Sequence, residues 1–278
     1  VIIALLLLTS LTNWPGAIIG ATALILAVTA ESLYATVAVR PVLREMPEKA
    51  DGTEPLTYSE LFWFHLPLAS TSVLVLLVQP MVTFALARLA NPTESLAAWP
   101  VLFQLTLMGR AAALALPEAI IALSKRPNSF QPLRRFSLLL GLALTGLMLL
   151  FVATPLANGY LFVVQDMTTE VGQLTLVALP LFVLYPGLTA LTSWLRALLI
   201  NEKQTTVINW GMGVNVSITA VILAVGLLMQ LPGLPTAAVA LNVSAIAEAI
   251  YLAQRGQRVL HLPMPLFGRP AAVPLAGD

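Results

Sequence analysis

The side chains most able to do chemistry in this sequence are a few charges inside long apolar runs. Arg110 lies within TLMGRAAALALPEAIIAL, near the middle of a predicted helix over residues 96–123. An always-charged guanidinium offers a planar fork of N–H donors that suits an anion. Two interpretations of Arg110 stay open: a binding group for an anionic solute, or a structural ion pair with a glutamate on a neighbouring helix.

Glu118 follows Arg110 by eight residues and comes directly after Pro117. Eight residues of helix rise by about 12 Å, so these two charges cannot pair directly. One interpretation makes Glu118 a site for a proton or another coupling cation. The alternative places its carboxylate close to the inner membrane surface, within reach of Lys125 or Arg126.

A second pair of charges lies in a segment that occurs twice in the sequence. WPGAIIGATALILAVTAESLY and LPGLPTAAVALNVSAIAEAIY align without a gap and share the Pro-Gly, a late glutamate and the closing tyrosine. Glu31 and Glu248 therefore occupy matching places, unless the similarity arose by chance. We expect either an inner-side charge clamp, with an arginine such as Arg196 or Arg40, or a transport role common to both segments.

Other candidate site residues are uncharged or are prolines. Gln79 and Asn215 are polar positions inside apolar runs and are candidates for the wall of a solute cavity. Proline removes a helical hydrogen bond and can break or bend a helix, and broken helices line the path of some transporters. The alternative is a helix that merely bends as it packs. The predicted helix-break positions are Pro67, Pro80, Pro117, Pro180 and Pro186.

The composition sets the class of protein. The chain is 58% hydrophobic and 10% charged, with a mean hydropathy of +0.89, whereas soluble domains carry about 25% charged residues. Apolar runs of about 20 residues recur along its length, and each can cross a bilayer as a helix. Membrane β-barrel strands would alternate polar and apolar residues, and none of these runs does. The sequence predicts an all-α polytopic membrane protein.

Several site types are excluded by what the chain lacks. Without cysteine there are no disulfides, thiol nucleophiles or iron–sulfur ligands. Its two histidines, His65 and His261, are far apart, so we expect no metal site and no cofactor. A net charge of +1 gives no bulk attraction to nucleic acid.

Eight transmembrane helices are predicted. Lys and Arg gather on alternate loops, which favours uninterrupted crossings and a cytoplasmic C-terminus. The predicted spans are residues 1–12, 16–39, 59–89, 96–123, 136–156, 174–200, 206–230 and 234–254.

The repeat predicts how these spans are grouped. Residues 58–256 form a complete six-helix C-terminal lobe, and residues 1–40 hold the last two helices of an N-terminal lobe. The first four helices of that lobe are expected earlier in the same chain, because Val1 is already helical in character. Residues 41–57 become a cytoplasmic inter-lobe linker and 257–278 a cytoplasmic tail. Parallel repeats of this kind recur among transporters.

Some stretches resemble a known superfamily. ELFWFHLPLASTSVLVLLVQPMVTFALARL, residues 60–89, resembles the seventh helix of the multidrug/oligosaccharidyl-lipid/polysaccharide (MATE-like) exporter superfamily. The two Pro-Gly segments are similar to its sixth and twelfth helices. Within it, QPMVTFALARL and the lone Arg110 look most like the progressive-ankylosis branch and its bacterial relatives.

That resemblance implies a secondary active exporter with alternating access, and no enzymatic activity. Its partners would be a small, anionic solute, H⁺ or Na⁺ as coupling ion, and the lipid bilayer of a bacterial inner (plasma) membrane. In the drug exporters of the superfamily acidic residues bind the coupling cation, so Glu118 and Glu248 are carried over as candidates.

Alternative functions remain open at this stage. Within transport they are a cation-coupled multidrug exporter or a lipid-linked saccharide flippase. A different class would be a membrane-embedded enzyme or a non-transporting scaffold subunit. A scaffold predicts that Arg110 is fully paired and that no central cavity exists. A cavity reached by Arg110, Gln79 and Asn215 would favour transport.

Overall fold

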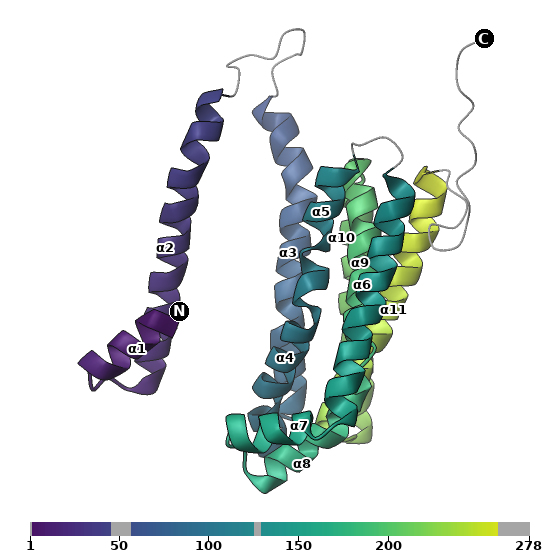
Figure 1. The fold of residues 1–278 in the computed structure, drawn as a ribbon. Helices are drawn as coiled ribbons and strands as arrows, with labels where there is room; N and C mark the ends of the chain where they lie inside the picture. The colour runs from purple at the N-terminus through teal and green to yellow at the C-terminus, as the bar shows by residue number, and fades with distance from the viewer. Residues whose placement is uncertain (1, 46–56, 125–128, 261–278) are drawn as a thin grey trace, which may run out of the picture. The chain divides into compact units, whose positions relative to one another are not determined.

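The computed structural model describes residues 2–45, 57–124 and 129–260, which are helical apart from short connections (Figure 1). The chain divides into two compact units, Val1–Leu56 and Thr57–Asp278. Each unit has its own internal contacts and is described by itself.

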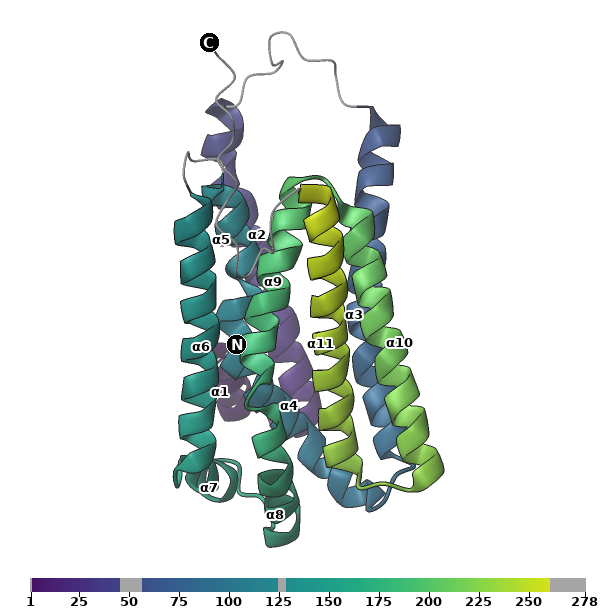
Figure 2. The same ribbon diagram turned by 90° about the vertical axis from the view of Figure 1, so that its right-hand side faces the viewer.

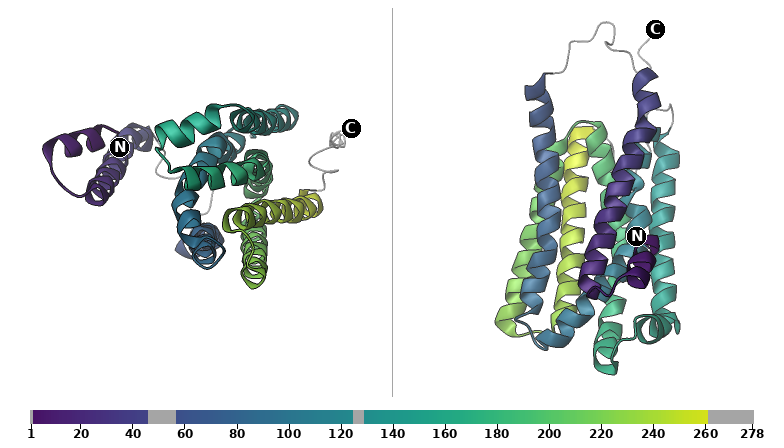
Figure 3. Two further views of the ribbon diagram at one scale, coloured as in Figure 1. Left: turned by 90° about the horizontal axis from the view of Figure 1, so that it is seen from below. Right: turned by 90° about the vertical axis from the view of Figure 1, so that its left-hand side faces the viewer.

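The first unit is a helical hairpin. α1 (Ile2–Leu11) packs against α2 (Gly16–Glu45), and the two are seen together in Figure 3. α2 has 30 residues, about 45 Å of helix, and continues past Pro41 into the segment predicted to be linker. α1 has 10 described residues, about 15 Å of helix.

The second unit is a bundle of long helices joined by short turns. α7 and η1 were not predicted, because residues 157–173 were expected to form a loop. Its elements are α3 (Tyr58–Leu86), α4 (Pro92–Leu114), α5 (Leu116–Leu123), α6 (Phe130–Ala153), α7 (Leu156–Asn158), the π-helix η1 (Gly159–Val164), α8 (Thr169–Ala178), the 3₁₀-helix η2 (Leu179–Phe182), α9 (Tyr185–Asn201), α10 (Thr205–Met229) and α11 (Gly233–Leu260).

The prediction of an all-α polytopic membrane protein is confirmed, with fewer spans than expected. Within the described ranges, six helices are long and apolar enough to cross a membrane. A seventh is counted when α8–η2 and α9, bent by 42° at their junction, are taken as one span. These seven cover every predicted span except residues 1–12, where the structure describes the 10 residues of α1.

α9 lies at the centre of the second unit. It contacts α4, α5, α6 and α11, while α10 packs between α3 and α11. Figure 2 shows α9 between α6 and α11. Small residues allow α6 and α9 to approach closely: a Cβ on Gly187 would lie 2.5 Å from Thr145 Oγ1. Close packing through glycine is a common way for membrane helices to associate.

The repeated Pro-Gly fixes the start of α11. Pro232 forms an isolated backbone bridge with Ala90, in the turn between α3 and α4. A Cβ on Gly233 would lie 2.8 Å from Ser95 Oγ, so only glycine fits without a shift. The matching Gly16 of the first unit meets nothing within 4 Å in its own unit.

The predicted helix breaks are found at three of the five prolines. Pro117 is the second residue of α5, after the interruption at Ala115, and Pro180 and Pro186 flank the junction between η2 and α9. The breaks predicted at Pro67 and Pro80 are not found, because α3 runs through both without interruption. Membrane helices tolerate such prolines when neighbouring groups satisfy the freed carbonyls.

A capping box starts α3. The Thr57 hydroxyl accepts the Glu60 backbone N–H at 3.3 Å, and Glu60 Oε2 accepts the Thr57 backbone N–H at 3.0 Å. Both donors of Thr57, the backbone N–H first and then the hydroxyl, lower the pKa of the Glu60 carboxyl from its ordinary value. This end of α3 precedes its membrane-spanning stretch, Ala69–Leu86.

Candidate functional site

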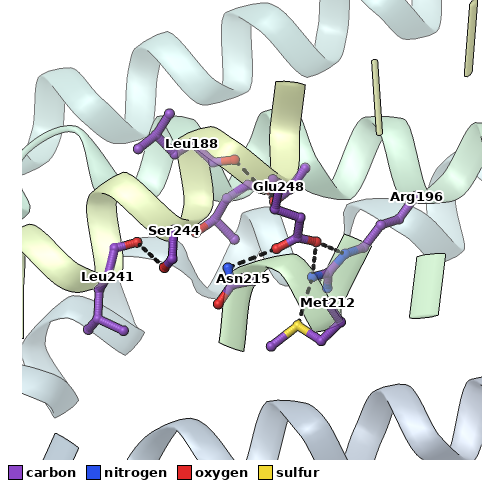
Figure 4. Close-up of polar contacts among 9 residues, drawn as sticks. Leu188, Arg196, Met212, Asn215, Leu241, Ser244 and Glu248 are labelled. Atoms are coloured by element: carbon purple, nitrogen blue, oxygen red, sulfur yellow. Dashed lines mark hydrogen bonds and ion pairs between the residues drawn. The ribbon is translucent and has the colours of Figure 1, made fainter. Parts of the chain in front are cut away.

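An ion pair joins α9 and α11 in the second unit (Figure 4). Arg196 Nε donates to Glu248 Oε1 at 2.8 Å, and Arg196 Nη2 donates to the same oxygen. The Glu248 side chain is 2% exposed and the Arg196 side chain 26% exposed. The structure thus pairs Glu248 with one of the two arginines that the sequence suggested.

Asn215 of α10 completes this network. Its Nδ2 donates to Glu248 Oε2 at 2.9 Å, so both carboxylate oxygens accept hydrogen bonds. Arg196 Nη2 also lies 3.5 Å from Met212 Sδ on α10. A buried carboxylate is costly unless its charge and its lone pairs are all satisfied. The network meets that requirement and ties three helices together.

The neighbouring hydroxyls make other hydrogen bonds. Ser244 donates to the carbonyl of Leu241, and Thr192 donates to the carbonyl of Leu188, each within its own helix (Figure 4). The carboxylate of Glu248 is therefore held by Arg196 and Asn215. Asn215 was predicted to line a cavity, and its contact with Glu248 was missed. The signal that could have found it is the general tendency of rare polar residues in membrane helices to bond to one another.

Arg110 on α4 rests on aromatic rings. Its guanidinium carbon lies 4.8 Å from the ring centre of Tyr185 and 6.0 Å from that of Phe103. Its buried Nε has no hydrogen-bond partner, and no carboxylate pairs with it among the described residues. The ion pair with a neighbouring glutamate, one of the two interpretations from the sequence, is thus not found there. Tyr185 is the first residue of α9, so Arg110 lies beside the α8–α9 bend.

The remaining candidates are bonded elsewhere or exposed. Gln79 Oε1 accepts the Trp99 indole N–H at 3.1 Å, which links α3 to α4. Glu118 is exposed in the first turn of α5, and its suggested contacts with Lys125 or Arg126 fall outside the described residues. Glu31 is exposed on α2 in the first unit, with no ion pair within the described part of the chain.

The cavities between the described helices of the second unit include three that bear on the site. One, of about 180 Å³, lies among the ends of α5, α6 and α9. A second, of about 400 Å³, lies along α6 and α9, and a third, of about 410 Å³, along α3 and α10. None is lined by Arg110, Gln79 or Asn215. Gln79 and Asn215 instead bond to other side chains.

These helices define an integral, polytopic membrane protein. Within the described ranges no group of three His, Asp or Glu side chains could hold a metal ion. Comparisons with protein-family models, with curated proteins and with solved structures found no match to this chain.

Proposed function

We propose that this protein is a secondary active transporter that moves a small anionic solute across the membrane by alternating access. The observation that carries the proposal is Arg110. It is a permanent cation inside the membrane-spanning stretch Pro92–Leu123, and its Nε is buried without an acceptor among the described residues. Charges in such places usually face a partner or a water-filled path.

The surroundings of Arg110 suit a site that is filled and emptied. Cation–π contacts with Tyr185 and Phe103, typically worth about 1–2 kcal/mol, offset part of the free-energy cost of burying the charge. They leave the N–H donors of Arg110 free for an anion. The adjoining bend between η2 and α9 is a point where helix segments could move against each other.

The resemblance to the MATE-like superfamily supports the rest of the proposal. It supplies the direction, export from a bacterial cell, and an ion gradient or the solute's own gradient as driving force. It also favours a transporter over an enzyme, and the Lys and Arg on alternate loops favour a cytoplasmic C-terminus. A scaffold subunit would be expected to pair Arg110 fully, and no such pair occurs in the described part of the chain.

A cation-coupled multidrug exporter is the second candidate. It is favoured by one observation, the carboxylate of Glu248, which is 2% exposed and held by Arg196 and Asn215. A proton or Na⁺ arriving there would compete with the Arg196 guanidinium, and this could couple ion binding to the packing of α9 against α11.

The test is uptake into inside-out vesicles that carry the full-length protein. Wild type, Arg110→Gln and Arg110→Lys are compared for citrate, phosphate, pyrophosphate and cationic dyes. Arg88→Gln is the matched control, because Arg88 also stacks on a ring, Phe84 at 3.6 Å, but is exposed.

We expect anion uptake that falls at least about tenfold in Arg110→Gln and is partly kept in Arg110→Lys, since losing a charged hydrogen bond costs about 1.5–3 kcal/mol. Arg88→Gln should transport like wild type. Dye uptake that is unchanged in Arg110→Gln but lost in Glu248→Gln would contradict the anion proposal and support the second candidate. No uptake of any probe by folded wild type would contradict both.

A further inference from the structure

Two cavities of the second unit meet at one tryptophan. Trp194 of α9 lines both the cavity of about 180 Å³ at the helix ends and the cavity of about 400 Å³ between α6 and α9. Its side chain is 2% exposed, so it is buried in the protein and not simply facing solvent or lipid.

The indole N–H of Trp194 lacks an acceptor. Nε1 is buried, and it has no hydrogen-bond partner within the described part of the chain. A buried tryptophan N–H normally finds one, and an orphaned donor costs about 1–3 kcal/mol. Because Trp194 lines both cavities, a molecule bound in either one lies against this ring.

The two cavities differ in chemistry along the axis of α9. The smaller one contains Ser124, Ser129 and Asn201, whereas the larger one runs from Trp194 towards Leu184 between mostly aliphatic side chains. Trp194 lies about 10 Å from Asn201 and about 15 Å from Leu184 along the helix. The order is polar groups, then a single N–H donor, then an apolar groove.

The apolar groove opens on the outside of its unit. Leu142 of α6 and Leu184 before α9 line it and are both exposed. Its floor is the close contact of α6 with α9, where a Cβ on Gly141 would lie 3.2 Å from Ala190 Cβ. The groove therefore runs along membrane-spanning helices, and its volume lies within the usual range for ligand sites, about 300–1,000 Å³.

We propose that these cavities form one site for a membrane phospholipid. One acyl chain lies in the groove between α6 and α9, an ester or phosphate oxygen accepts the Trp194 N–H, and the headgroup end meets Ser124, Ser129 and Asn201. This order matches that of a phospholipid entering from the membrane surface. The proposal does not depend on what the protein transports.

Quenching of tryptophan fluorescence by brominated lipid tests the site. The full-length protein is reconstituted in phosphatidylcholine vesicles with or without bromine on the acyl chains. Each variant keeps one of the five tryptophans of this sequence and has phenylalanine at the other four. Trp194 is compared with Trp99, which is 4% exposed, bonds to Gln79 and lines none of the three cavities. Trp210, exposed on α10, reports contact with bulk lipid.

We expect quenching of Trp194 at least twofold greater than that of Trp99, although the exposed fractions of the two residues are similar. Ser137→Leu, which fills the groove from α6, should bring it down to the level of Trp99. Leu142→Phe narrows the exposed mouth and should act in the same direction if Ser137→Leu does not fold. Quenching of Trp194 that equals that of Trp99, or that neither variant lowers, would overturn the proposal.

Retention of lipid gives an independent readout of the hydrogen bond. Native mass spectrometry of the purified protein should show phospholipid bound to wild type, and about three- to tenfold less bound to Trp194→Phe, as expected for one lost hydrogen bond. Trp99→Phe is the control and should retain lipid like wild type. Equal retention by Trp194→Phe and wild type would remove Trp194 from the site and contradict the proposal.

Discussion

Arg196 approaches Glu248 with the Nε/Nη2 edge of its guanidinium, and both nitrogens donate to the single oxygen Oε1. The other oxygen, Oε2, accepts the Asn215 amide N–H at 2.9 Å. Each carboxylate oxygen thus has a partner on a different helix, α9 for Oε1 and α10 for Oε2. In this way one carboxylate on α11 joins three helices.

Breaking this pair from the arginine side should be costly. Arg196→Met leaves a carboxylate that is 2% exposed without its cation, and we expect a loss of about 3 kcal/mol in the free energy of unfolding. The double variant Arg196→Met/Glu248→Leu should recover most of that loss, because neither charge remains. Thermal unfolding in detergent measures both. A double variant no more stable than Arg196→Met would contradict this account.

Asn215→Leu should destabilise the same network by less. It removes one neutral donor from Glu248 Oε2 but leaves the Arg196 contact, so we expect a loss of about 1–3 kcal/mol. In a double-mutant cycle the effects of Asn215→Leu and Glu248→Leu should not add, because both remove the same hydrogen bond. Additive effects would show that the two side chains do not interact in the folded protein.

The close contact of α6 with α9 predicts opposite effects at two glycines. Gly187→Ala places a methyl group 2.5 Å from Thr145 Oγ1 and should cost about 1–3 kcal/mol through overpacking. Gly146→Ala on α6 meets nothing within 4 Å and should stabilise by about 0.5–1 kcal/mol, the usual gain in a helix.

Thr145→Ala should rescue Gly187→Ala, since it removes the oxygen that the new methyl group would meet. Unfolding by heat or denaturant in detergent measures the stability of wild type, the three single variants and the double variant. A destabilised Gly187→Ala that Thr145→Ala does not rescue would place the strain elsewhere.

The start of α3 should respond to pH. The two hydrogen bonds from Thr57 hold the folded-state pKa of Glu60 below its ordinary 4.5, so they stabilise the helix start fully above that value. The stabilisation is lost as the pH falls through the lowered pKa, where the carboxyl is protonated. Amide hydrogen exchange at Leu61, whose N–H bonds to the Thr57 carbonyl, measures the fraying.

Below that pKa, exchange at Leu61 in wild type should match that of Glu60→Gln at the same pH. At neutral pH it should be slower in wild type. Equal exchange in the two proteins at neutral pH would show that the charge of Glu60 adds nothing to the capping box at this helix end.

The class of this protein followed from the sequence because it depends on composition and run length alone. Apolar runs of bilayer length predict helices wherever they fall, and charges such as Arg110 and Glu248 are conspicuous within them. The Pro-Gly before α11 was also visible, and Gly233 does sit where a Cβ would meet Ser95 Oγ.

Pairing within the bundle was decided only by the tertiary structure. Asn215 and Glu248 are 33 residues apart, and Gln79 and Trp99 are 20 apart, on helices whose rotation and offset the sequence does not encode locally. The effect of each proline on its helix also depended on its neighbours in space. α3 continues through Pro80, whereas Pro186 lies in the first turn of α9, next to the bend. Whether a freed carbonyl bends a helix, or a polar side chain lines a cavity, depends on which neighbour lies within hydrogen-bond reach, and packing alone determines that neighbour.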